Sequence, residues 1–260
     1  MNHSTIRRSI LAMAVFAACG AATADPLPPF TFDPSAAGLD GSAVHADNIL
    51  VSDYSTVHTS GSTFSETGYL AVSGFQLGGV TLSTPSLNAD YSLFFKFTGN
   101  GTLTQSGNPV TTPTAGSFTA LTFTLYGSNS PTTFGFDPNN TPTSSAVNPM
   151  ALATGSLLYG AVGTLPSGNN KTFVPSADAT LNFNVLNAAF FESPVPFYEL
   201  AETAFTNTTS EVQSFDGGFR IRQGGGTVNF TVAAVPEPGT YGLMLAGLGA
   251  MAFVAKRRRR

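Results

Sequence analysis

Apolar and polar side chains alternate along much of the middle of the chain. Residues 121–125, 179–185 and 228–232 each place an apolar side chain at every second position, with Thr or Asn between. A period of two is typical of a β-strand that buries one face. Residues 68–77 and 93–97 predict two further strands, the second more buried. Because Phe118 and Ala120 lie on the opposite parity to residues 121–125, we expect a β-bulge near Ala120.

Turn-forming residues separate the predicted strands. They are Gly-Gly at 78–79, Gly-Asn-Gly at 99–101, Ser-Gly-Asn-Asn at 167–170 and Gly-Gly-Gly at 224–226. We expect the last of these to join residues 219–222 to the final strand as a hairpin. The one helix predicted covers residues 197–205, after two prolines. Many short strands with such turns predict an all-β fold, either an antiparallel β-sandwich or a jelly roll.

The composition is poor in charge and rich in Phe. Of 260 residues, 10% are charged, 22 are Phe and none is Trp. Ordinary soluble domains have roughly 25% charged residues, so this composition excludes a coiled coil and a charged disordered tail. Phe-Thr-Phe-Asp-Pro at 30–34 recurs as Phe-Gly-Phe-Asp-Pro at 134–138. A strand that ends in an Asp-Pro turn explains both segments, and a repeated half-domain is the alternative.

The N-terminus has the features of a secretory signal peptide. Two arginines precede an apolar run at 10–18, and small residues then lead to Ala22 and Ala24. We expect export by the Sec machinery and removal of residues 1–24 by signal peptidase. Lipoprotein processing at Cys19 is the alternative. Cleavage after Ala24 would remove the single cysteine, so the exported chain would have no disulfide and no thiol chemistry.

The last 26 residues, 235–260, contain three parts in a fixed order. A Pro-Glu-Pro motif precedes an apolar stretch at 240–255, and a basic tail follows it. The stretch is 16 residues long, slightly short of the ~20 residues that cross a bilayer comfortably. The basic tail should remain cytoplasmic, and it could not be buried in a protein core. The tail consists of Lys256, Arg257, Arg258, Arg259 and Arg260.

Residues 235–260 are similar to the PEP-CTERM sorting signal of Gram-negative bacteria. The resemblance implies that an exosortase, a membrane cysteine protease-transpeptidase, recognises Pro236, Glu237 and Pro238 as substrate residues. It also implies transient anchoring in the inner membrane, removal of the transmembrane helix, and transfer to the cell surface or extracellular matrix. Two prolines around a carboxylate form the rigid, extended segment that a protease could read.

Residues 25–234 remain as one β-rich extracellular domain, and this domain is acidic. Four cations against 14 carboxylates give segment 25–235 a net charge of −10. Such a charge argues against a nucleic-acid partner. Arg220 and Arg222 lie two residues apart, hence on one face of a strand. They either bind acidic polysaccharide or keep a strand face soluble.

Groups that could act in catalysis do not form a familiar constellation. His45 and His58 are the histidines beyond the signal peptide, and no Gly-x-Ser-x-Gly motif is present. A pair of carboxylates could act in a glycoside hydrolase. The candidates are Glu192, Glu199, Glu202 and Glu211. Glu199 and Glu202 would share a face only if the predicted helix forms. We therefore expect a protein that is not an enzyme, with a secreted hydrolase as an alternative.

Asp137, Asn139 and Thr141 place oxygen groups at alternate positions and form a candidate calcium site. An EF-hand would need Gly at the sixth position, where Pro142 stands, and Glu at the twelfth, where Asn148 stands. A turn held by Asp and Asn side chains is the interpretation we favour. We therefore expect no cofactor, and calcium is the metal ion that this segment would suit best.

Several stretches resemble the flocculation-associated PEP-CTERM proteins, PepA type, of floc-forming betaproteobacteria. They are residues 29–34, 46–48, 51–54, 64–68 and 72–75. The resemblance implies a surface or matrix protein that acts with exopolysaccharide in cell aggregation, floc or biofilm formation. Its adhesion would be multivalent, since many weak sites add. A polysaccharide-binding module with a defined groove is the alternative, because the chain is rich in Asn, Thr and aromatic residues.

Overall fold

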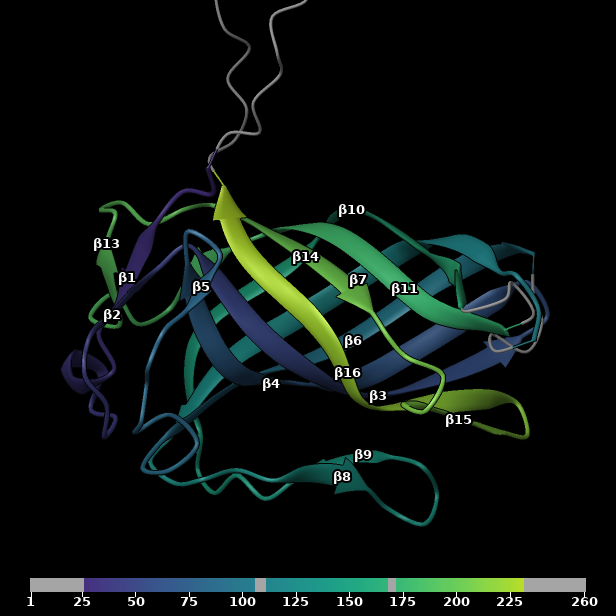
Figure 1. Cartoon of the computed structure of the whole chain (residues 1–260), viewed down its shortest axis with the longest axis horizontal. Coiled ribbons are helices and arrows are strands. Elements are labelled where there is room, and N and C mark those ends of the chain that lie inside the picture. Colours follow the sequence, from purple (N-terminus) through teal and green to yellow (C-terminus); the bar gives the residue numbers. More distant parts are fainter. Residues whose placement is uncertain (1–25, 106–110, 168–171, 232–260) are drawn as a thin grey trace, which may run out of the picture.

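Eight antiparallel strands form a sheet that closes on itself (Figure 1). The computed structural model describes residues 26–105, 111–167 and 172–231. Around the sheet the order is β3-β4-β6-β7-β10-β11-β14-β16, and β16 pairs with β3. Closure follows because β10 pairs with β7 on one side and with β11 on the other. The eight strands are β3 (Asn48–Ser60), β4 (Thr63–Leu77), β6 (Ser92–Gln105), β7 (Ala115–Ser128), β10 (Met150–Ser167), β11 (Thr172–Asn182), β14 (Leu200–Thr206) and β16 (Gly218–Thr231).

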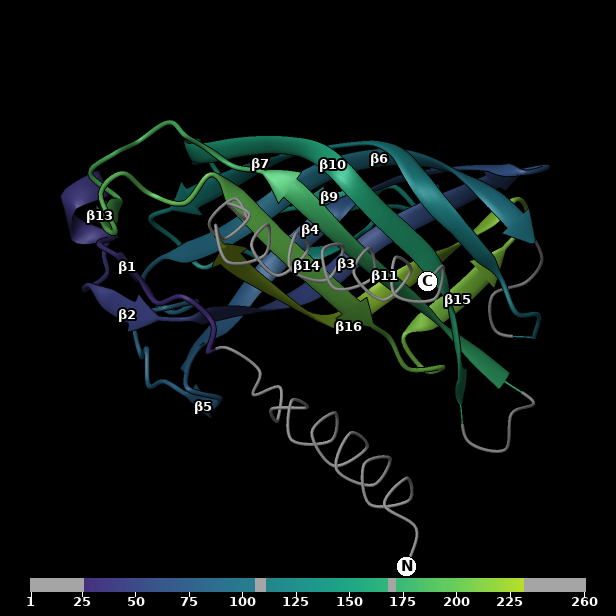
Figure 2. The same ribbon diagram turned by 90° about the horizontal axis from the view of Figure 1, so that it is seen from above.

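The prediction of an all-β fold with antiparallel sheets is confirmed. The structure adds one feature to the predicted sandwich: its two facing layers belong to one continuous sheet. We call this closed sheet the cylinder, and its strands run obliquely to the long axis (Figure 2). On β6, Phe95 and Phe97 are buried inside the cylinder, whereas Lys96 and Thr98 are exposed. The alternation that predicted strands therefore separates the interior of the cylinder from its outer face.

Two glycine-rich segments that were predicted as turns lie inside strands, so both predictions are wrong. Residues 99–101 belong to β6, and residues 224–226 belong to β16. The ring of Phe64 occupies the place of a Cβ at Gly101, and the ring of Phe205 does so at Gly226. Glycine at these positions therefore makes room for a large side chain of the neighbouring strand. The Gly-Gly turn at 78–79 is confirmed, with φ of 59° and 79°.

Residues 197–205 do not form the predicted helix. β14 pairs with β11 on one side and with β16 on the other. Ala201 is buried and Glu202 is exposed, as strand alternation requires. Pairing on both sides provides hydrogen-bond partners for the backbone N–H and C=O groups of β14. These partners are distant in the sequence, so the local propensity of residues 197–205 does not reveal them. The bulge predicted near Ala120 is confirmed, because the register shifts between the pairs Asn100–Ala120 and Gly101–Phe118.

One end of the cylinder is covered by three short strands rich in Phe (Figure 1). They are β1 (Phe30–Phe32), β2 (Val44–Ala46) and β13 (Phe191–Ser193). Phe32 is 1% exposed, and its ring lies in a cluster at centroid distances of 4.6–6.2 Å. Aromatic contacts at these distances add to the stabilisation from burial. The neighbouring rings are Phe30, Phe75, Phe190, Phe191, Phe197 and Phe230. We call this end the aromatic cover.

A hairpin of β8 (Phe134–Phe136) and β9 (Pro142–Ser144) lies outside the cylinder (Figure 1). The ring of Phe134 lies 5.4–5.6 Å from the rings of Tyr54, Tyr69 and Phe94, on β3, β4 and β6. These aromatic side chains face outward, and the hairpin covers them. Phe94 points to the outer face, unlike Leu93 and Phe95, and it is buried because the hairpin covers it.

The remaining elements are short additions to these units. β5 (Val80–Thr81) pairs with β4, β12 (Asn184–Val185) with β10, and β15 (Val212–Phe215) with β16. A single turn of 3-10 helix, η1 (Ser35–Ala37), follows β1.

The described part of the chain begins and ends at the same end of the cylinder. The ring of Phe30 in β1 lies 5.1 Å from the ring of Phe230 near the end of β16. Both rings belong to the aromatic cover. Within the described ranges, no helix is long and apolar enough to cross a membrane. The predicted signal peptide at 1–24 and the predicted sorting segment at 235–260 lie outside those ranges.

Candidate functional site

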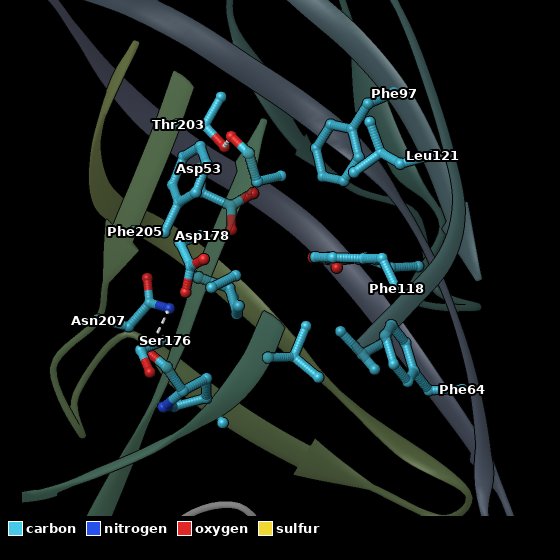
Figure 3. A pocket seen from close by; sticks show the side chains of 18 of the residues that line it. Asp53, Phe64, Phe97, Phe118, Leu121, Ser176, Asp178, Thr203, Phe205 and Asn207 are labelled. Carbon is cyan, nitrogen blue, oxygen red and sulfur yellow. Dashed lines mark hydrogen bonds between the residues drawn. The ribbon is translucent and has the colours of Figure 1, made fainter. Parts of the chain in front are cut away.

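A cavity of about 120 Å³ lies inside the cylinder (Figure 3). None of the rings of the aromatic cover lines it, so it lies in the half away from that cover. Most of its lining is apolar, and Phe rings from several strands contribute to it. Phe64, Phe97, Phe118 and Phe205 are among them (Figure 3). Ligand sites are typically apolar cavities with a few well-placed polar groups. The polar groups of this cavity therefore define its chemistry.

Two carboxylic acids, Asp53 and Glu66, project into this apolar space from adjacent strands. On β3, Asp53 lies on the inward face that Val57 also occupies. On β4, Glu66 lies on the inward face between Phe64 and Leu70. Both carboxylates thus occupy positions where the alternation calls for an apolar side chain. We call Asp53 and Glu66 the acid pair.

Ser55 lies on the inward face of β3, beside the acid pair. The β3–β4 register places Ser55 opposite Gly68, where an added Cβ would lie 2.6 Å from the Ser55 Cβ. Because Gly68 has no side chain, Ser55 fits between the strands with no exposed surface. Its hydroxyl donates a hydrogen bond to Asp53 Oδ2 at 3.0 Å. The other carboxylate oxygen, Asp53 Oδ1, is buried with no hydrogen-bond partner.

Burial changes the acidity of both members of the acid pair. It raises the pKa of Glu66 from 4.5 to about 7, against a smaller opposing effect of the Ser55 hydroxyl. Burial also raises the pKa of Asp53 well above its usual range, and the nearby charge of Glu66 raises it further. Asp53 is only 4% exposed, and Glu66 is half-buried because it borders the cavity. Apolar surroundings disfavour an ionised carboxylate that has no cation beside it.

No cation balances these acids within the described lining of the cavity. Its ionisable residues are Asp53, Glu66 and Asp178, all acidic, and Asp178 is exposed. Asn207 adds a further buried acceptor: its Nδ2 donates to the Pro175 carbonyl at 3.0 Å, while its Oδ1 has no partner. The cavity therefore presents buried acceptor oxygens, and it suits a ligand that brings hydrogen-bond donors or positive charge.

The two histidines identified in the sequence lie outside this cavity. His45 on β2 is exposed, with its Nδ1 3.0 Å from Thr31 Oγ1. His58 on β3 is exposed, with its ring 5.4 Å from that of Phe215. Neither arrangement places a nucleophile and an orienting acid around the imidazole, as a catalytic triad requires.

The four glutamates considered for a hydrolase do not line the cavity either. Glu192 is exposed on β13 in the aromatic cover, and Glu202 is exposed on β14. Glu199 is also exposed, just before β14. Glu211 is half-buried and accepts a hydrogen bond from the Thr208 N–H at 2.5 Å. Since the predicted helix is absent, Glu199 and Glu202 do not share a helix face.

Asp137 forms a turn stabilised by its own side chain. Its Oδ1 accepts the N–H groups of Asn139 at 2.8 Å and Thr141 at 2.7 Å. Asp33 does the same after β1, where its Oδ1 accepts from Ser35 Oγ at 2.6 Å and from the Ala36 N–H at 3.1 Å. The repeated sequence segment is thus one local turn used twice. Among the described residues, no three His, Cys, Asp or Glu side chains gather where a metal ion could bind.

The two arginines share one face of β16, as their spacing predicted, and this is the outward face. Arg222 is exposed. Arg220 donates to Gln213 Oε1 at 2.6 and 2.9 Å and to Asn140 Oδ1 at 3.0 Å, and its guanidinium lies 5.3 Å from the ring centre of Phe136. Arg220 therefore fastens the β8–β9 hairpin to the cylinder, and its side chain is half-buried.

The sequence patterns did not identify Asp53 and Glu66 as a pair. Asp53 lies in the segment Val51-Ser52-Asp53-Tyr54, and Glu66 in Phe64-Ser65-Glu66. Each acid follows a buried apolar residue by two positions, and this parity was the available clue. Parity gives the face of each side chain, but only the β3–β4 register brings the two acids to one cavity.

The comparison with known protein families finds the PEP-CTERM protein-sorting motif at residues 234–260. No curated protein and no solved structure matches the chain. The motif confirms the resemblance drawn from the Pro-Glu-Pro segment, the apolar stretch and the basic tail. The chain is an exported protein targeted to exosortase, and its destination is the cell surface or the extracellular space. Pro236, Glu237 and Pro238 themselves lie outside the described residues.

Proposed function

We propose that this protein is a non-catalytic component of the extracellular matrix of a Gram-negative bacterium. In this role it acts with exopolysaccharide in cell aggregation, floc or biofilm formation, and it binds no nucleic acid. The sorting motif supports the location. The chemistry of the outer face supports the partner, because it presents hydroxyl groups with little charge.

A row of hydroxyl side chains crosses four neighbouring strands of the outer face. The pairing registers place Thr67 on β4 beside Thr98 on β6, Thr122 on β7 and Ser156 on β10. Thr98 and Thr122 are exposed, and their Oγ1 atoms lie 3.2 Å apart. Hydroxyl groups at strand spacing can donate and accept hydrogen bonds with a neutral, hydrated polymer. This hydroxyl row is the observation that carries the proposed partner.

The net charge of −10 for residues 25–235 agrees with a role in a hydrated matrix. This charge disfavours direct attraction to acidic polymers, because the segment contains only four cations. One of the four, Arg220, already binds Asn140 of the hairpin. Contact through hydroxyl groups avoids this repulsion. Each contact would be weak, so many copies on a cell surface would be needed for firm adhesion.

The position of the chain ends supports an orientation for the displayed protein. The sorting motif follows β16, whose last described residues lie in the aromatic cover. While the chain is anchored, the aromatic cover is therefore the end nearer the membrane, and the cavity half points away from it. The hydroxyl row lies on the side of the cylinder, where it can contact polymer both while the chain is anchored and after exosortase has released it.

Deletion of the gene, followed by complementation, tests the proposed role. Loss of flocs and release of exopolysaccharide into the medium are expected on deletion, and the wild-type gene should restore both. Thr98→Val together with Thr122→Val should restore them poorly, because the hydroxyl row is interrupted without loss of side-chain volume. Thr206→Val is the matched control, on β14 across the cylinder from β6. Normal flocs after deletion, or full rescue by the double variant, would contradict the proposal.

A polysaccharide-binding module is the second candidate, because the same hydroxyl row could form a defined binding face. Pull-down with the polymer of the producing cells, and with a panel of other glycans, separates the two. Saturable binding to one glycan supports the module, whereas weak binding to many hydrated polymers supports a matrix role.

The processing step has its own test. Mass spectrometry of the exported protein should find a chain that starts at Asp25 and ends near Pro238, without the basic tail. An intact C-terminus in the extracellular fraction would show that exosortase does not process this chain.

A further inference from the structure

We propose that the cavity inside the cylinder binds a hydrophobic amine. The ammonium group lies between the carboxylates of Asp53 and Glu66, and the apolar body lies among the Phe rings of the lining. This site is separate from the hydroxyl row on the outer face, and it does not depend on the matrix role.

The acid pair gives the first argument. Both carboxyl groups project into one cavity whose described lining contains no Lys, Arg or His. Asp53 is 96% buried, and its Oδ1 has no hydrogen-bond partner. A buried acceptor without a partner costs stability, so such an atom in a cavity points to a ligand that donates to it. An ammonium group supplies three donors and the missing positive charge.

The apolar lining gives the second argument. Phe97, Phe118 and Phe123 line the same cavity as the acid pair. The faces of aromatic rings attract cations, and cavities that combine such rings with carboxylates suit alkylammonium groups. The same lining disfavours a sugar, whose many hydroxyl groups would lack partners there.

The charge of the lining excludes the commoner apolar ligands with acidic heads. Asp53 and Glu66, from β3 and β4, are the ionisable groups that project into the cavity, and Asp178 on β11 is exposed. A fatty-acid carboxylate would meet these acids with no cation to balance it. A neutral alcohol could donate one hydrogen bond but would bring no positive charge to favour the ionised acid pair.

The volume limits the size of the apolar body. A cavity of about 120 Å³ is comparable to engineered cavities of roughly 150 Å³ that take up benzene. We therefore expect a body of about six carbon atoms to fit the present cavity. Hexylamine, hexanol and hexanoate are a matched set of probes, since they share one chain and differ in the head group.

Calorimetric titration of the exported protein with these three probes tests the proposal. At pH 7 we expect hexylamine to bind at least about tenfold more tightly than hexanol, because its donors are charged. Hexanoate should bind most weakly. Titration in two buffers of different ionisation enthalpy should also detect proton release on amine binding, because an ammonium group favours the ionised acid pair.

Variants of the acid pair separate the head-group contact from simple apolar binding. Asp53→Asn with Glu66→Gln should lower the affinity for hexylamine at least about tenfold and leave that for hexanol unchanged. Glu202→Gln is the control, because Glu202 is exposed on the outer face of β14. It should bind hexylamine like the wild type.

Several outcomes would overturn the proposal. They are tighter binding of hexanol or hexanoate than of hexylamine, an unchanged hexylamine affinity in the folded double variant, or no binding of hexylamine at all. If the double variant does not fold, the comparison of head groups on the wild-type protein decides. A negative result here would leave the floc phenotype of the deletion strain unaffected, so the two proposals fail separately.

Discussion

The acid pair should make the protein less stable as the pH rises. Glu66 has its pKa raised by burial from 4.5 to about 7 in the folded protein. Below about pH 4.5 both the folded and the unfolded chain hold the proton. Between pH 4.5 and about 7 the unfolded chain releases it and the folded chain retains it, so stability falls with rising pH and then levels off. Asp53, whose pKa is raised in the same direction, extends this fall.

The magnitude follows from the raised pKa of Glu66. A rise from 4.5 to about 7 corresponds to a loss of about 3 kcal/mol in the free energy of unfolding between acidic and alkaline pH. This is a large part of the 5–15 kcal/mol typical of a folded domain. The charged group that acts on the acid pair from within it is a carboxylate, and the lining of the cavity contains no cation that would reverse the sign.

Urea unfolding at pH 5 and at pH 8, followed by far-ultraviolet circular dichroism, measures the effect. The wild-type protein should be more stable at pH 5. Glu66→Gln should reduce the difference, since the amide does not titrate and the like charge beside Asp53 is gone, and the part that the burial of Asp53 contributes should remain. Glu202→Gln should retain the wild-type difference, because Glu202 is exposed. A wild-type stability that is equal or higher at pH 8, or a Glu66→Gln variant with the full difference, would refute the reasoning.

Three further substitutions test the packing. Gly101→Ala should destabilise the protein by about 1–3 kcal/mol in urea unfolding, because the new Cβ overlaps the Phe64 ring, whereas Gly135→Ala on β8 should be tolerated. Phe32→Ala should cost about 3–5 kcal/mol in the same assay, since it empties the centre of the aromatic cover. Asp137→Ala should cost about 1 kcal/mol, because two exposed N–H groups lose their acceptor and are solvated by water instead, and added calcium should leave the wild-type midpoint unchanged. Equal stability of each variant and the wild type would contradict the corresponding contact.

Local patterns in the sequence predicted the elements whose causes are local. The turn at 78–79 needs two residues with positive φ, and Gly-Gly provides them. The Asp-Pro segments predicted side-chain turns, and Asp33 and Asp137 both accept the nearby N–H groups. The predictions of a helix at 197–205 and of a hairpin turn at 224–226 were wrong for the same reason. In each case a distant strand supplies the pairing, and a short window of sequence does not contain it.

The sequence by itself determined the all-β class, the inward and outward faces of the strands, and the address of the protein. Alternation gives the faces because side chains on a strand point to opposite sides in turn. The sorting motif gives the address because exosortase targeting is encoded in a continuous segment. Only the tertiary structure decided that the sheet closes, since the pairing of β16 with β3 joins the last and the first strand of the cylinder, which are far apart in the sequence. Closure then places Asp53 and Glu66 in one apolar cavity, where burial rather than sequence sets their charge.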